Sequence, residues 1–163
     1  MHQHLANLAS DRSPSKSPTL SLWETTTRQA LAGAREASAA AALAAYERAL
    51  SIAHQLIEAP PAGRAEDCIA ALVVSHHNLA DWHIERSDPE TAVCHLCDAH
   101  EALIALFLDT DRDSVVRQAA LRHSRETHMA LISHVARHGS HPLVTRALRK
   151  GCLALNIDSP RQH

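Results

Sequence analysis

Hydrophobic and polar residues follow one another along most of the chain with the period of an α-helix. Stretches rich in Ala and Leu repeat at three- and four-residue spacing, and Pro, Gly or Asp clusters separate them. This pattern predicts an all-α fold class without strands. Helices are expected at about residues 22–35, 39–59, 65–86, 89–108, 114–137 and 142–155. Because the loops are short, we expect about six antiparallel helices in three hairpins, as an array or a bundle.

Individual residues mark where these helices begin. Ser21 followed by Glu24 indicates a capping box at the start of the first helix. Asp88 is expected to cap the fourth helix, with Pro89 at its first position, where the missing N–H has no cost. Asp113 is the expected cap of the fifth helix.

The two ends of the chain differ from the rest. Residues 1–19 are polar and contain several Ser and Pro, a composition that does not offset the entropy lost on ordering. We therefore expect a disordered N-terminal tail at 1–19, one α-helical domain at 20–157 and a C-terminal tail at 158–163.

Composition limits the classes of function. Of 163 residues, 45% are hydrophobic but only 2% aromatic, so the core must consist mainly of Ala, Leu, Val and Ile. The chain has 16 basic and 18 acidic residues, and neither sign dominates a long segment, so nucleic acid and membrane surfaces are not expected partners. No signal peptide or membrane-spanning window is recognised, so we expect a cytoplasmic location and four reduced cysteines.

One predicted hairpin carries a regularly spaced set of residues. They are His76, Leu79, Ala80, His83, Ala92, Leu96 and Ala99, with a second, partial copy at Ala42, Tyr46 and Ala49. This spacing resembles the tetratricopeptide repeat, whose pattern is W-x2-L-G-x2-Y followed by A-x3-F. From Ala42 to Ala92 the offset is 50 residues, whereas the repeat period is about 34 residues. The helices are therefore expected to be longer than those of the family.

The resemblance implies a degenerate tetratricopeptide-like array, right-handed and without enzymatic activity. Its function would be to bind a partner protein or peptide, and a homodimer is a further partner hypothesis because terminal faces of short arrays expose core-type surface. Two apolar stripes on the fourth helix agree with an array, since each helix then contacts two neighbours. The stripes are Ala92, Leu96, Ala99, Leu103 and Leu106, and Val93, Cys97, His100, Ile104 and Phe107.

His76 and His83 are interpreted as flat rings that replace the aromatic rings of the repeat. They are seven residues apart, roughly 10 Å along the helix axis at 1.5 Å per residue. Ligands of one ion lie about 2 Å from it, so this pair cannot share a metal. A buried imidazole favours its neutral form, so protonation should reduce the stability of the fold.

A second hypothesis is a His- and Cys-rich metal-binding helical protein involved in metal homeostasis or stress response. Its candidate ligands for zinc or iron are Cys94, Cys97, His100, His134 and His138. Cys94 and Cys97 are one helical turn apart, and His134 and His138 have an i, i+4 spacing that can chelate. No second C-x-x-C occurs in the chain, so the leading interpretation contains no metal or other cofactor.

Catalysis is not expected. The chain contains no G-x-S-x-G elbow, glycine-rich phosphate loop or H-E-x-x-H motif, and it has only four glycines. The sequence therefore predicts a binding module, with metal binding as the alternative.

Overall fold

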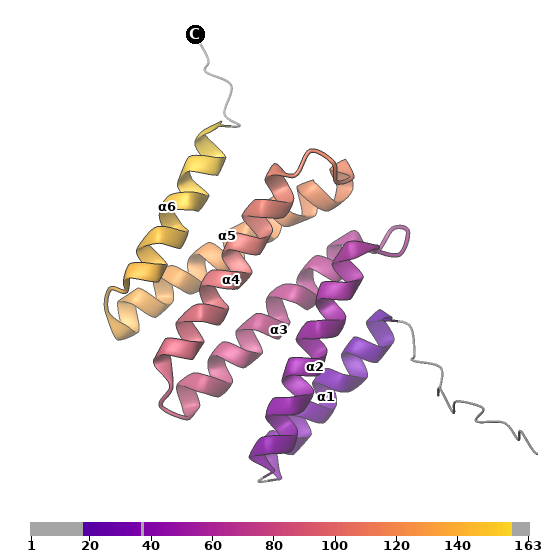
Figure 1. The fold of residues 1–163 in the computed structure, drawn as a ribbon, viewed down its shortest axis with the longest axis vertical. Helices are drawn as coiled ribbons and strands as arrows, with labels where there is room; N and C mark the ends of the chain where they lie inside the picture. The colour runs from indigo at the N-terminus through magenta and orange to yellow at the C-terminus, as the bar shows by residue number, and fades with distance from the viewer. Residues whose placement is uncertain (1–17, 37, 158–163) are drawn as a thin grey trace, which may run out of the picture.

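The fold is known from a computed structural model, which describes residues 18–36 and 38–157. These residues form six helices and no strand (Figure 1), so the predicted all-α fold class is confirmed. The helices are α1 (Leu20–Arg35), α2 (Ala39–Glu58), α3 (Ala65–Glu85), α4 (Pro89–Leu108), α5 (Ser114–His138) and α6 (Pro142–Ile157). The expected tails lie almost entirely outside the described residues, at 1–17 and 158–163.

Side-chain caps agree with the sequence at one helix and differ at another. Asp88 caps α4 as predicted, because its Oδ1 accepts a hydrogen bond from the Thr91 N–H at 3.2 Å. The prediction of a capping box at Ser21 is wrong. Ser21 lies inside α1, and the N-cap is Thr19, whose Oγ1 accepts from the Leu22 N–H at 3.0 Å.

The ends of α5 show a similar difference. Asp113 occupies the N-cap position of α5, but its side chain makes no capping hydrogen bond, which corrects the expected cap. At the other end Gly139 has φ of 88°, in the left-handed region that favours glycine. This residue allows the chain to turn directly into α6.

Each helix runs antiparallel to the one before it, and the chain proceeds from α1 at one end of the molecule to α6 at the other (Figure 1). Helices α1, α3 and α5 form one layer, in which α3 contacts both of the others. Helix α2 packs over α1 and α3, while α6 packs mainly against α4 and only lightly against α5. Helix α4 is therefore the central element of the C-terminal half.

The core consists of small aliphatic side chains, as the composition requires. Both predicted stripes of α4 face inward, since every member is buried except Leu106, which is partly buried. Fully buried alanines, such as Ala42, Ala92, Ala99 and Ala119, allow the helix backbones to approach closely. The molecule is thus held together by interdigitated Ala, Leu and Val rather than by large aromatic rings.

Helix α4 corrects the expectation that the chain contains no membrane-spanning window. Among the described residues, Pro89–Leu108 is the one helix long and apolar enough to span a membrane by length and composition. In the fold this helix contacts α3, α5 and α6, and its two apolar stripes are buried against them. Its hydropathy is explained by its central position in the packed array.

Candidate functional site

All but one of the positions that carry the repeat-like pattern are buried in helix interfaces. Those buried in the structure are Ala42, Tyr46, Ala49, His76, Leu79, Ala80, Ala92, Leu96 and Ala99. His83 is the exception, since it is half-buried and its Nδ1 lies 3.2 Å from Asp88 Oδ2. The pattern therefore coincides with packing positions rather than with an exposed site.

Four histidines from three helices form a continuous row of rings. His76 Nδ1 lies 3.3 Å from His95 Nδ1, close enough for one nitrogen to donate to the other. The rings of His76 and His54 are perpendicular, with centroids 5.7 Å apart, and His83 is stacked near His95 at the same distance. His95 was not recognised from the sequence, because it belongs to neither apolar stripe of α4.

Burial sets the protonation of this row. Desolvation, followed by the neighbouring His95, His54 and His77, lowers the pKa of His76 to about 3. Burial also lowers the pKa of His95, with a further contribution from His83. The central rings are therefore neutral at neutral pH and pack as aromatic rings do.

The cysteines of the metal hypothesis are in different environments. Cys94 is exposed, whereas Cys97 is buried. Burial, with nearby Glu101 and Asp98, raises the pKa of the Cys97 thiol to about 11, so this residue is protonated at neutral pH and a metal ion would have to displace its proton in order to bind. Within residues 18–36 and 38–157, no group of three or more His, Cys, Asp or Glu side chains is arranged to hold an ion.

The hydrogen bonds of His100 determine its tautomer. The Thr127 hydroxyl donates to the Ser124 carbonyl oxygen at 3.0 Å, so its oxygen accepts a hydrogen bond from His100 Nδ1 at 2.8 Å. The lone pair on His100 Nε2 is therefore free, and this buried atom has no hydrogen-bond partner among the described residues. It faces Gly151, where an added Cβ would lie within 2.4 Å of Nε2.

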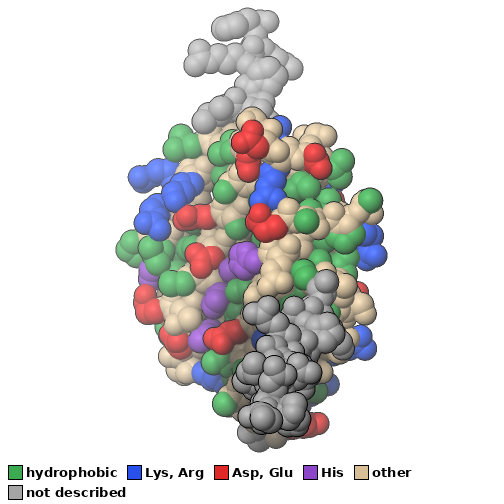
Figure 2. Space-filling view, turned by 45° about the vertical axis from the view of Figure 1, so that its right-hand side comes forward, with side chains coloured by type: hydrophobic (Ala, Val, Ile, Leu, Met, Phe, Trp, Pro, Cys, Tyr) green, Lys and Arg blue, Asp and Glu red, His purple; other side chains and the backbone are tan. Residues whose placement is uncertain are grey.

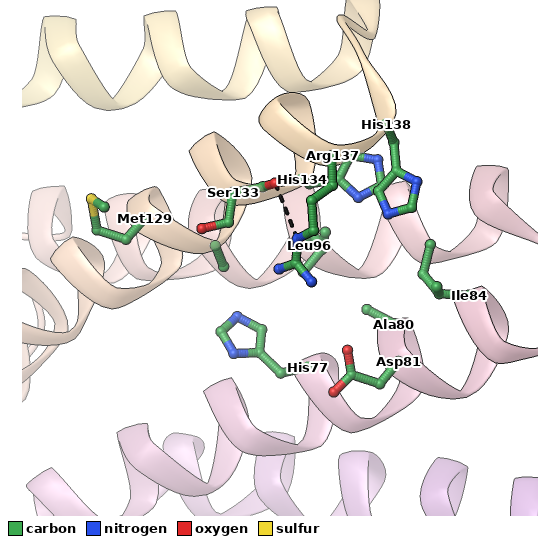
Figure 3. Close-up of a pocket in the computed structure, with 11 residues that line it drawn as sticks. His77, Ala80, Asp81, Ile84, Leu96, Met129, Ser133, His134, Arg137 and His138 are labelled. Atoms are coloured by element: carbon green, nitrogen blue, oxygen red, sulfur yellow. Dashed lines mark hydrogen bonds between the residues drawn. The ribbon is translucent and has the colours of Figure 1, made fainter.

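The remaining metal candidates, His134 and His138, lead to a pocket between α3 and α5. Their ring centroids are 4.7 Å apart, His134 being buried and His138 exposed. The pocket has a volume of about 280 Å³ (Figure 3). It is lined by His77, Ala80, Asp81, Ile84, Leu96, Met129, Ala130, Ser133, His134, Arg137 and His138. We call it the α3–α5 pocket.

Polar side chains from two helices point into this pocket. His77 and Asp81 project from α3, while the Arg137 guanidinium reaches down from α5 toward them (Figure 3). Arg137 Nε donates to the Ser133 carbonyl oxygen at 3.4 Å. His77 Nε2 is buried and has no partner among the described residues. Burial lowers the pKa of His77, although Glu126 and Asp81 oppose this shift.

A second pocket lies on the other side of α3. It has a volume of about 300 Å³ and is lined by Leu31, Ala34, Arg35, Tyr46, Asn78, Asp81, Trp82 and Glu85. We call it the α1–α3 pocket. Asp81 lines both pockets, so the two are neighbours on the face formed by α1, α3 and α5.

Sequence reasoning did not find this site. It did not single out His77, Asp81, Ser133 or Arg137. The available signal was that His77 and Asp81 are four residues apart and so share one helix face. Arg137 is 56 residues further along the chain than Asp81. It lines the same pocket only because α3 packs against α5.

The fold and these pockets define a small all-helical array with a two-pocket face. The chain belongs to the family described as "Protein of unknown function (DUF2753)", whose model matches residues 21–163. No curated protein and no solved structure matches the chain. The resemblance to tetratricopeptide repeats therefore rests on the residues of this chain.

Proposed function

We propose that the chain is a non-enzymatic, tetratricopeptide-like module that binds a partner protein or peptide across the face of α1, α3 and α5. The repeat-like spacing of His76, Leu79, Ala92 and Leu96 supports this proposal, together with consecutive antiparallel helices that lie side by side. In such arrays one layer of helices presents an extended binding surface.

The observation that carries the proposal is the pair of pockets on one face. The α1–α3 and α3–α5 pockets share Asp81 and together extend across three helices. A partner segment that crosses α3 can place one side chain in each pocket. Buried Tyr46 and Trp82 provide aromatic surface in the first pocket, and Arg137 provides hydrogen-bond donors in the second.

The surface charge supports a protein rather than a nucleic-acid partner. Acidic and basic side chains are interspersed on the part of the surface seen in Figure 2, and the formal net charge of the chain is -2. The two pockets, on another face, are lined by residues of both signs, including Asp81, Glu85, Arg35 and Arg137. A nucleic-acid site requires clustered Lys and Arg that neutralise phosphates. Mixed charges suit the polar rim of a protein interface.

Selection from a phage library of random linear peptides tests the proposal. The protein is immobilised, and enriched peptides are then measured against Asp81→Lys and against Asp111→Lys, which reverses an exposed charge in the loop before α5. We expect peptides that bind wild type and Asp111→Lys equally and bind Asp81→Lys at least about tenfold more weakly. Failure to enrich any peptide, or equal binding to both variants, would contradict the proposed face.

A further inference from the structure

The α3–α5 pocket contains polar groups that the described part of the chain leaves without partners. Arg137 uses Nε for a hydrogen bond to the Ser133 carbonyl oxygen, whereas its two terminal nitrogens make no hydrogen bond or ion pair with a described residue. His77 Nε2 is buried without a partner. A buried acceptor such as His77 Nε2 costs free energy when it has no partner. The exposed Arg137 leaves its terminal nitrogens free to bind, so a ligand that contacts both residues would be favoured.

The charges of the pocket restrict that ligand. Asp81 and Arg137 project into the pocket from opposite helices (Figure 3), but their charged atoms are more than 4.0 Å apart and form no ion pair. A simple anion would be attracted to Arg137 and repelled by Asp81. A simple cation would be attracted to Asp81 and repelled by Arg137. A molecule with both a carboxylate and an ammonium group complements both residues at once.

The size and apolar wall restrict it further. The volume of about 280 Å³ accommodates only a compact molecule. Ala80, Ile84 and Leu96 line the same pocket, and Ala80 and Leu96 are buried. An aliphatic side chain fits this wall, because binding removes its apolar surface from water.

We propose that the α3–α5 pocket binds a free α-amino acid with an aliphatic side chain. The carboxylate accepts two hydrogen bonds from the terminal nitrogens of Arg137, the ammonium group donates to Asp81, and the side chain packs against Ala80, Ile84 and Leu96. His77 Nε2 provides a further polar contact. This ligand goes beyond the proposed partner-binding function and requires only the chain itself.

Isothermal titration calorimetry with L-leucine, L-valine and L-alanine tests the proposal directly. Isocaproate, which lacks the ammonium group of leucine, and isoamylamine, which lacks its carboxylate, serve as matched probes. We expect at least one amino acid to bind, and each probe to bind at least about tenfold more weakly than leucine. The expected effect of Asp81→Asn or Arg137→Gln on amino-acid affinity is a loss of similar size.

The control variants are Asp111→Asn and Arg149→Gln, which change exposed residues outside the pocket and should keep wild-type affinity. No binding of any of the three amino acids at up to about 10 mM would overturn the proposal. Isocaproate binding as tightly as leucine would also overturn it, because the pocket would then recognise a carboxylate alone. Neither result would affect the peptide selection, so failure of this ligand and failure of the proposed function are distinguishable.

Discussion

The buried ring of His76 packs as an aromatic ring would, and burial keeps it neutral. It is 4% exposed and touches the rings of His54 and His95. Removing a charge from water is costly, so the folded protein binds a proton here only near pH 3. An imidazole in this position makes the stability of the fold depend on pH.

Acid should therefore destabilise the protein well above the range in which carboxylates titrate. Below about pH 6.5 the unfolded chain protonates His76 while the folded chain does not, so the free energy of unfolding falls as the pH falls. Between about pH 7 and pH 5 the loss for one such histidine is roughly 2 kcal/mol. Urea denaturation at the two pH values measures it.

His76→Phe keeps a flat ring but cannot titrate, so its stability should fall less between the same pH values. His138→Gln, which replaces an exposed histidine, should keep the wild-type dependence. An equally steep loss in His76→Phe would show that the buried ring is not the source of the acid sensitivity.

The four cysteines should differ in reactivity with iodoacetamide. Cys94 and Cys152 are exposed, whereas Cys68 and Cys97 are buried. With a pKa of about 11 instead of 9.0, Cys97 has about 100-fold less thiolate at neutral pH. Mass spectrometry of the labelled protein should find Cys94 and Cys152 alkylated first, and all four cysteines only in denaturant. Rapid labelling of Cys97 in the folded protein would contradict this burial.

Helix α6 is docked on α4 through a close approach at one glycine. Gly151 is buried against His100, and an added Cβ would be 2.4 Å from Nε2, which is shorter than real contacts. Gly151→Ala should therefore destabilise the fold by about 1–3 kcal/mol, as overpacking does. Thermal unfolding followed by circular dichroism measures the change.

The same substitution should be harmless once the ring is removed. In a His100→Ala background the clash is absent, and Gly151→Ala should be neutral or stabilise α6 by up to about 1 kcal/mol through helix propensity. Equal costs of Gly151→Ala in both backgrounds would show that the contact with His100 does not position α6.

The helices were predictable from the sequence because their signals are local. Proline, glycine and aspartate at the breaks placed α4 at the same bounds as observed and the others within a few residues. The first cap was assigned to Ser21 because Ser21 and Glu24 match a capping box, although Thr19 precedes them and forms the actual cap. Caps two residues apart are difficult to distinguish without backbone angles.

The pockets could not be predicted in the same way. His77 and Asp81 appear in the sequence as polar residues on the outer side of α3, and nothing local indicates Arg137 as their neighbour. The α3–α5 pocket forms only because helices separated in sequence by the whole of α4 pack against each other. The hydrophobic pattern within one helix predicts which of its faces is buried. It does not predict which other helix packs beside its polar face.

The C-terminal end of the array has an apolar groove that differs from the polar face. The groove lies between α4 and α6, has a volume of about 400 Å³, and is lined by Glu101, Ile104, Ala105, Leu108, Lys150, Leu153 and Ala154. Leu108 and Leu153 are among the exposed large hydrophobic residues. Terminal faces of arrays expose surface that internal repeats bury.

We expect this end to associate with a second copy of the chain. Leu153→Asp places a charge in the groove and should weaken self-association by at least about tenfold. Val115→Asp, at an exposed position near the start of α5, should leave it unchanged. Sedimentation velocity over a range of concentrations measures the change, and a wild-type protein that is monomeric throughout would contradict the expectation.

The position of Asp81 has a thermodynamic consequence. Its single carboxylate lines both pockets, so a group that pairs with it from one side removes a negative charge available to the other. Occupancy of the two pockets is then linked by a coupling free energy, and linkage requires that each ligand change the affinity of the other by the same factor. Two ligands that both need this carboxylate are antagonists, even though each has a pocket of its own.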